Sequence, residues 1–126
     1  MALNPVNSPV IELMGRLDPA DGVGRTSGGD RSDKVCMTIR VRDESISDIR
    51  FECDGCQATV ACAATAARLA RGRHLDEAAE IAPDTVADAL GTLPSQYRHC
   101  AELACEALSA AIMDYVFRCV ERERPE

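Results

Sequence analysis

The chain has 126 residues, of which 46% are hydrophobic and 28% charged, a composition that can bury a core and is not typical of a disordered chain. It carries 14 basic and 21 acidic residues, for a net charge of −7, and has two Tyr, two Phe and no Trp. Nucleic-acid binders normally carry a basic surface, so this composition argues against that class. No apolar run approaches the roughly 20 residues that a membrane span needs. Residues 1–10 show no secretory signal, so we expect a cytoplasmic protein without a membrane partner.

Alternating apolar and polar residues predict two strands in the first half of the chain. The run at 34–41 places every second residue on one apolar face, and a second alternating run covers 46–53. The polar segment 42–45 between them predicts an antiparallel hairpin. The apolar stretch 10–14 predicts a brief amphipathic helix, whereas 18–32 contains four glycines and is expected to form mostly loop.

Helices are expected throughout the second half. Residues 57–71 contain seven alanines, and alanine is the best helix former. Two shorter helical segments follow near 75–81 and 83–90. Apolar residues at three- and four-residue steps predict a long amphipathic helix from about 99 to 121. This order of elements predicts an α+β fold, a small antiparallel sheet with helices packed on one face. No domain boundary is visible, so residues 1–126 are expected to form a single domain.

The seven cysteines do not indicate a disulfide framework, because their number is odd and no export signal precedes them. Four lie within predicted helices or on the apolar face of a predicted strand, and we interpret them as packing residues: Cys53, Cys62, Cys105 and Cys119. Cys36 alternates onto the opposite face of its strand and is expected to be exposed. Cys53 and Cys56 form a C-x-x-C pair, but Cys53 faces the predicted core, which argues against a redox or metal pair.

Cys56 and Cys100 differ from the other cysteines because each lies at the predicted start of a helix. The helix dipole and the free N–H groups at such a position stabilise a thiolate. His99 directly precedes Cys100, so two thiolates and an imidazole form a set of candidate metal ligands. From the local pattern alone, the alternative is that both cysteines are ordinary buried residues. His74, the other histidine, lies in a polar turn and is expected to be solvated.

Four segments in the same order resemble the IscU/NifU N-terminal type of iron–sulfur cluster assembly scaffold, over about residues 9–118. Residues 18–24 resemble the family's Asp-x-x-x-Val-Gly segment with one extra residue, and 46–56 resemble its Ile-x-Asp-Ile-x-Phe strand followed by Gly-Cys. Residues 89–94 resemble its Leu-Gly-x-Leu-Pro segment, and 99–104 its His-Cys-x-x-Leu-Ala helix start. The resemblance implies an IscU/NifU-like sheet of about three strands with helices on one face.

The resemblance also implies a metal site, which in the family has three cysteines, an aspartate and a histidine. Cys56 matches the middle cysteine, and His99 with Cys100 matches the last pair. Asp33 matches the aspartate that ends the family's Asn-Pro-x-Cys-Gly-Asp segment. Arg31 stands where the first cysteine of that segment belongs, which is the main departure from the family pattern.

The departure leaves four ligands: one carboxylate, one imidazole and two thiolates. This set suits zinc or ferrous iron, and its number suffices for a 2Fe–2S cluster. Arg31 adds a positive charge where the family has a thiolate ligand. We therefore expect the binding of a metal ion to be retained more readily than the assembly of a cluster. Cys36 could replace the missing thiolate only if its strand register were shifted by one residue.

By this resemblance the chain is expected to be a scaffold, not an enzyme, that binds iron and sulfide and transfers the cluster to apo iron–sulfur proteins. A cysteine desulfurase would supply sulfur as a persulfide at Cys100 or Cys56. Residues 93–97 depart from the family's Leu-Pro-Pro-Val-Lys stretch, so the resemblance does not extend to docking of the Hsp70-type chaperone. Arg31 favours an alternative: a scaffold-fold protein, with structural zinc or no metal, that is an interaction, regulatory or sulfur-acceptor partner of a cysteine desulfurase.

Overall fold

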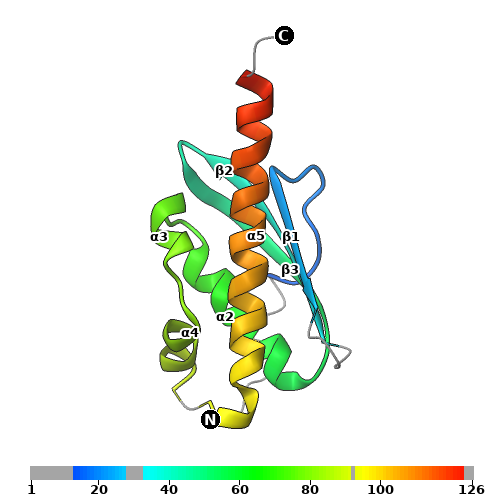
Figure 1. Cartoon of the computed structure of the whole chain (residues 1–126), viewed down its shortest axis with the longest axis vertical. Helices are drawn as coiled ribbons and strands as arrows, with labels where there is room; N and C mark the ends of the chain where they lie inside the picture. Colours follow the sequence, from blue (N-terminus) through cyan, green and yellow to red (C-terminus); the bar gives the residue numbers. More distant parts are fainter. Residues whose placement is uncertain (1–12, 28–32, 92, 124–126) are drawn as a thin grey trace.

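The computed structural model describes residues 13–27, 33–91 and 93–123, and at its centre is a three-stranded antiparallel sheet (Figure 1). The strands are β1 (Gly22–Ser27), β2 (Lys34–Arg42) and β3 (Ser45–Asp54), in the order β1-β2-β3. Asp43 and Glu44 join β2 to β3, and both have a positive φ, 53° and 62°. A two-residue turn of this kind matches the twist of the flanking strands. The predicted hairpin is confirmed.

Strand β1 corrects the expectation that residues 18–32 form mostly loop. Gly22 and Gly24 lie within this strand and pair with β2. Both are buried, because helix α5 (Arg98–Glu123) crosses directly over them and a Cβ at either position would collide with the backbone of that helix. Glycine inside a strand often marks such a close approach of another backbone. The glycines that suggest a loop in the sequence therefore serve the packing of a helix on a strand.

The other helices follow the sequence prediction. They are α2 (Gln57–Ala70), α3 (Leu75–Ala79), α4 (Pro83–Leu90) and the short 3-10 helix η1 (Ser95–Tyr97). Pro83 occupies the first turn of α4, where its fixed φ is favourable and its missing N–H costs nothing. His74 is only partly solvated, because its Nδ1 accepts a hydrogen bond of 3.2 Å from the backbone N–H of Asp76 and so caps α3.

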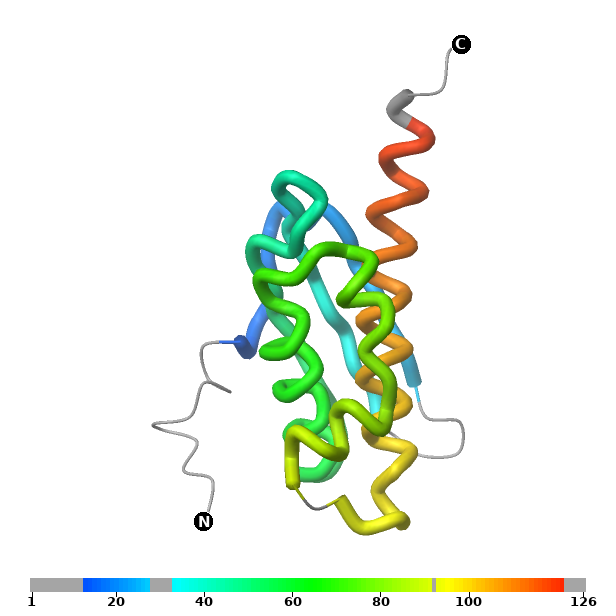
Figure 2. Tube along the Cα trace, turned by 90° about the vertical axis from the view of Figure 1, so that its left-hand side faces the viewer, coloured from blue at the N-terminus to red at the C-terminus, as the bar shows by residue number. Residues whose placement is uncertain are grey.

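Helices α2 and α5 pack on one face of the sheet, with α5 over β1 and β2 and α2 over β3 (Figures 1 and 2). The inner surfaces of both helices are rich in alanine, so they approach the sheet closely. Larger side chains from the sheet fill the core, each 1% exposed or less: Val35, Met37, Ile39, Ile49 and Phe51. Burying a side chain of this size stabilises the fold by about 1.5–3 kcal/mol. The predicted α+β arrangement is confirmed.

Helix α5 extends past the rest of the molecule at its C-terminal end (Figure 2). Its predicted apolar face is buried from Ala104 to Ile112, whereas Val116 is 39% exposed because the helix leaves the core there. The helix predicted at 10–14 lies largely outside the described residues, and Met14 forms a single bridge with Phe51 of β3. In the part of the chain that is described, no helix has both the length and the apolar character required to cross a membrane.

Candidate metal and sulfur site

The four predicted ligands come from three segments that meet at one end of the sheet. Asp33 directly precedes β2, and Cys56 lies between β3 and α2, where it is the N-cap residue of the helix. His99 and Cys100 lie in the first turn of α5. This is the end at which β1 and β3 finish and α2 and α5 begin (Figure 1). The antiparallel order of the strands thus gathers residues that are far apart in the sequence.

Asp33, His99 and Cys100 form a compact group of ligand atoms. One atom from each lies within 4.8 Å of the other two. Nε2 of His99 is 3.4 Å from Oδ2 of Asp33 and 3.5 Å from Sγ of Cys100. Asp33 and Cys100 are buried, and His99 is half-buried. An oxygen, a nitrogen and a sulfur donor at this spacing suit zinc or ferrous iron.

Cys56 is outside that group of three, and Thr59 connects it to Cys100. The Thr59 hydroxyl oxygen is 3.4 Å from Sγ of Cys56, and it donates a hydrogen bond of 3.4 Å to Sγ of Cys100. Thr59 is fully buried. Sequence reasoning missed this residue. The signal for it is its position three residues after Cys56, because side chains three apart on a helix are neighbours.

Gly55 leaves room for this arrangement. Its φ is +157°, and a Cβ at this position would press against the carboxylate of Asp33 and lie 3.1 Å from the Thr59 hydroxyl oxygen. Asp33, Gly55 and Cys56 also line an open groove at the ends of β2 and β3. Solvent therefore reaches the site from the side of Cys56.

The two site thiols have opposite environments. Cys56 is exposed, and hydrogen bonds from the Thr59 hydroxyl and from backbone N–H groups of the first helical turn lower its pKa. Cys100 has 0% of its surface exposed, and burial raises its pKa. In the metal-free protein Cys56 is therefore the more reactive of the two thiols.

Burial makes Cys53, Cys62 and Cys105 less reactive than Cys56. Cys62 and Cys105 are buried, as predicted for packing residues, and burial raises their pKa values to about 12 and about 11. Cys53 is half-buried, and burial together with two nearby carboxylates raises its pKa to about 11. Cys119 is also half-buried rather than enclosed.

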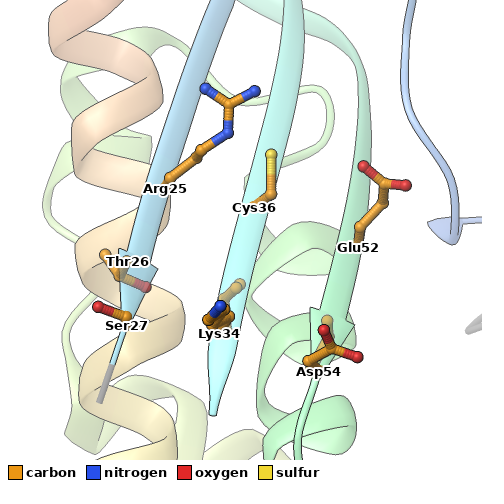
Figure 3. Close-up of a pocket in the computed structure, with 9 residues that line it drawn as sticks. Arg25, Thr26, Ser27, Lys34, Cys36, Glu52 and Asp54 are labelled. Carbon is orange, nitrogen blue, oxygen red and sulfur yellow. The ribbon is translucent and has the colours of Figure 1, made fainter. Parts of the chain in front are cut away.

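Cys36 lies on the face of the sheet that points away from the helices, as predicted, but it is half-buried rather than exposed. It pairs with Arg25 on β1 and with Glu52 on β3, and the three side chains form a row across the strands (Figure 3). The register therefore has no one-residue shift that would turn Cys36 toward the ligands, and this thiol does not replace the missing cysteine. Arg31, at the position of the family's first cysteine, lies outside the described residues.

Comparison with known proteins assigns the chain to a family. A model of the NifU-like N-terminal domain matches residues 3–122. The chain is 42% identical over 102 residues to iron-sulfur cluster assembly scaffold protein IscU 1 of Archaeoglobus fulgidus, a match that spans 81% of this chain and 67% of the relative. It is 32% identical over 118 residues to the scaffold protein IscU of Aquifex aeolicus, spanning 92% of this chain and 71% of the relative. The chain belongs to the NifU-like N-terminal domain family.

A solved structure shares the fold. The N-terminal domain of a nitrogen-fixing NifU-like protein from Brucella abortus superposes with a TM-score of 0.66 at 17% sequence identity. The match covers 90% of this chain and 95% of that one. The IscU/NifU-like fold expected from the sequence motifs is confirmed.

Proposed function

We propose that this chain is a scaffold for iron–sulfur cluster assembly, a carrier rather than an enzyme. It binds iron and sulfide as cargo and passes the cluster to apo iron–sulfur proteins. The observation that carries the proposal is the convergence of Asp33, Cys56, His99 and Cys100, with ligand atoms from three of them within 4.8 Å of one another. The relatives from Archaeoglobus fulgidus and Aquifex aeolicus, both named as cluster assembly scaffolds, support the same role.

The donor set fits this cargo. Two thiolates, an imidazole and a carboxylate supply two ligands for each iron of a 2Fe–2S cluster, and histidine replaces cysteine on an iron in other cluster proteins. A mixed set holds a cluster less firmly than four thiolates do, which suits a protein that must release it. Cys56 is exposed, so a cysteine desulfurase has access to deliver sulfur and an apo-protein has access to receive the cluster.

Anaerobic reconstitution tests the proposal. Metal-free protein incubated with ferric iron and sulfide, which together have the oxidation state of a 2Fe–2S cluster, is expected to gain visible charge-transfer absorption together with bound iron and labile sulfide. Cys56→Ala and Cys100→Ala are expected to lose both. Cys36→Ala removes a thiol on the far face of the sheet and is expected to retain them. A wild-type protein that gains neither iron nor sulfide shows that the proposal is wrong.

A second candidate function rests on the same side chains. One carboxylate, one imidazole and two thiolates are also a four-coordinate zinc set, and the replacement of the family's first cysteine by Arg31 favours it. The chain would then be an interaction, regulatory or sulfur-acceptor partner of a cysteine desulfurase. Metal analysis of the purified protein distinguishes the two candidate functions. Tightly bound zinc, together with failure to bind a cluster, supports the zinc-binding partner over the cluster scaffold. A sulfur acceptor would also speed alanine production from cysteine by the desulfurase, and replacement of both Cys56 and Cys100 by alanine would abolish that stimulation.

A further inference from the structure

Three side chains of the site follow one another from solvent to the core. Cys56 is exposed, whereas Thr59 and Cys100 are each 0% exposed. The hydroxyl oxygen of Thr59 is 3.4 Å from the sulfur of each cysteine. The two sulfur atoms are therefore no farther apart than the sum of these two contacts, with a single hydroxyl facing both.

We propose that sulfur is accepted at Cys56 and then moves inward to Cys100, with Thr59 as the positioning residue for this transfer. The inference rests on the proposed function, because it takes the site to be one that handles sulfur. It adds the order in which the two thiols act and a role for a side chain outside the ligand set.

Access decides which thiol is loaded first. A persulfide donor must bring its terminal sulfur into contact with the attacking thiolate. Cys100 offers no exposed surface to such a donor, whereas Cys56 opens onto the groove that it lines with Asp33 and Gly55. The donor therefore reaches Cys56, and the sulfur reaches Cys100 only from Cys56.

The inward step is an exchange at sulfur with no net oxidation or reduction. Cys56 first carries a persulfide, S–SH, and the thiolate of Cys100 attacks its terminal sulfur. A bond forms between that sulfur and Sγ of Cys100 while its bond to Sγ of Cys56 breaks. Cys56 leaves as a thiolate, and the proton stays on the sulfur that moves. An S–S bond of about 2.05 Å extends the loaded Cys56 side chain across the gap toward Cys100.

The Thr59 hydroxyl is suited to both ends of this step. It contacts both sulfur atoms, and its single hydrogen can bond to either one. Directed at Sγ of Cys100, the hydrogen stabilises the attacking thiolate. Rotation of the hydroxyl then turns the hydrogen toward Sγ of Cys56, which gains the negative charge as it leaves. The Thr59 side chain is fully buried, and packing keeps its oxygen between the two sulfur atoms.

The transfer can be followed in the metal-free chain with glutathione persulfide as the sulfur donor. Samples taken anaerobically over time are alkylated, digested with trypsin and analysed by mass spectrometry. Cys56 falls in the tryptic peptide 51–68 with Cys53 and Cys62, and Cys100 falls in the peptide 99–118 with Cys105. Fragmentation of each peptide therefore assigns the persulfide to one cysteine. All samples carry Cys36→Ala, which removes the thiol on the outer face of the sheet.

In the otherwise unchanged chain, persulfide is expected first at Cys56 and later at Cys100. Cys100→Ala is expected to stop the sulfur at Cys56, and Cys56→Ala to slow the loading of Cys100 at least about tenfold. Thr59→Val keeps the shape but removes the hydroxyl. Because this hydroxyl also bonds to Cys56, the transfer rate is measured from the Cys56 persulfide already formed. That step to Cys100 is expected to slow about tenfold, the effect of one lost charge-assisted hydrogen bond. Thr59→Ser keeps the hydroxyl and is expected to restore most of the rate.

Three results would overturn the inference. One is rapid loading of Cys100 in Cys56→Ala, and another is an unchanged transfer rate in Thr59→Val. The third is release of hydrogen sulfide with a Cys56–Cys100 disulfide, which means attack on the inner sulfur instead. If Thr59→Val does not fold, the two cysteine variants still decide the direction of transfer. No iron is present, so failure of this transfer and failure of cluster reconstitution are separate outcomes.

Discussion

Nε2 of His99 lies 3.4 Å from Oδ2 of Asp33, although Asp33 precedes the central strand and His99 belongs to the last helix. The carboxylate is 11% exposed, so little water competes with this contact. It orients the imidazole at the site, where the same nitrogen is 3.5 Å from the sulfur of Cys100. Arg98 in the same turn of α5 forms an exposed ion pair of 2.7 Å with Asp84 of α4. The first turn of α5 thus contacts Asp33 on one side and α4 on the other.

Replacing Asp33 tests whether this carboxylate is a ligand. Asp33→Asn keeps the shape but removes the charge, and we expect it to weaken zinc or ferrous iron binding at least about tenfold, as loss of a partner in a metal site does. Competitive titration against a chromogenic chelator measures the affinity. Asp54→Asn is the matched control, because Asp54 is exposed at the end of the neighbouring strand and outside the group of ligand atoms. Equal affinities in Asp33→Asn and the wild type would contradict the assignment.

Thiol reactivity should follow the environments of the cysteines. Because hydrogen bonds lower the pKa of Cys56, a larger fraction of it is thiolate near neutral pH, and its reactivity persists to lower pH than that of an ordinary thiol. Cys62, with a pKa of about 12, remains a thiol. We expect iodoacetamide at about pH 8 to modify Cys56 well before Cys62 or Cys105.

Mass spectrometry of partly alkylated protein gives the order of modification. In concentrated urea all seven cysteines are expected to react at similar rates, which separates the effect of the fold from the effect of neighbouring residues in the sequence. Native Cys62 reacting as fast as native Cys56 would be incompatible with the burial described above.

The site was predictable where its chemistry is local. Cys56, His99 and Cys100 stand out because each lies at a helix start, a feature that the hydrophobic pattern locates. Asp33 carries no such signal and entered through a family motif, because its proximity to His99 arises only when β2 and α5 pack together. Thr59 was missed because a threonine in an alanine-rich helix resembles an ordinary packing residue. Its role is visible only when the structure shows that its hydroxyl also contacts the sulfur of Cys100.

The fold was likewise predictable only where an element depends on its local sequence. The hairpin and the helices could be predicted from the periodicity of apolar residues within single segments. Strand β1 does not, because Gly22 and Gly24 reflect contact with α5, a segment far away in the sequence. When a residue is required by contact with a distant part of the chain, its local sequence pattern can indicate a different structure, which here is a loop.

Gly24→Ala tests the close packing of α5 on β1. A Cβ at this position would overlap backbone atoms of the helix, which cannot move aside as a flexible side chain would. We expect the free energy of unfolding to fall by about 1–3 kcal/mol, the usual effect of overpacking. Urea denaturation should show a lower midpoint with an unchanged slope. Ser27→Ala, at an exposed position of the same strand, is expected to change stability by less than about 0.5 kcal/mol.

Arg31→Cys tests what the departure from the family pattern does to the cargo. It restores the third thiolate of the family's site and removes a positive charge, and thiolates are the ligands that hold iron–sulfur clusters best. We expect higher cluster occupancy after anaerobic reconstitution and a longer cluster lifetime on exposure to a chelator, both followed by visible absorption. Arg31→Ala removes the charge without adding a ligand, so it separates the two causes. A cluster that is no more stable in Arg31→Cys than in Arg31→Ala would mean that position 31 does not reach the metal.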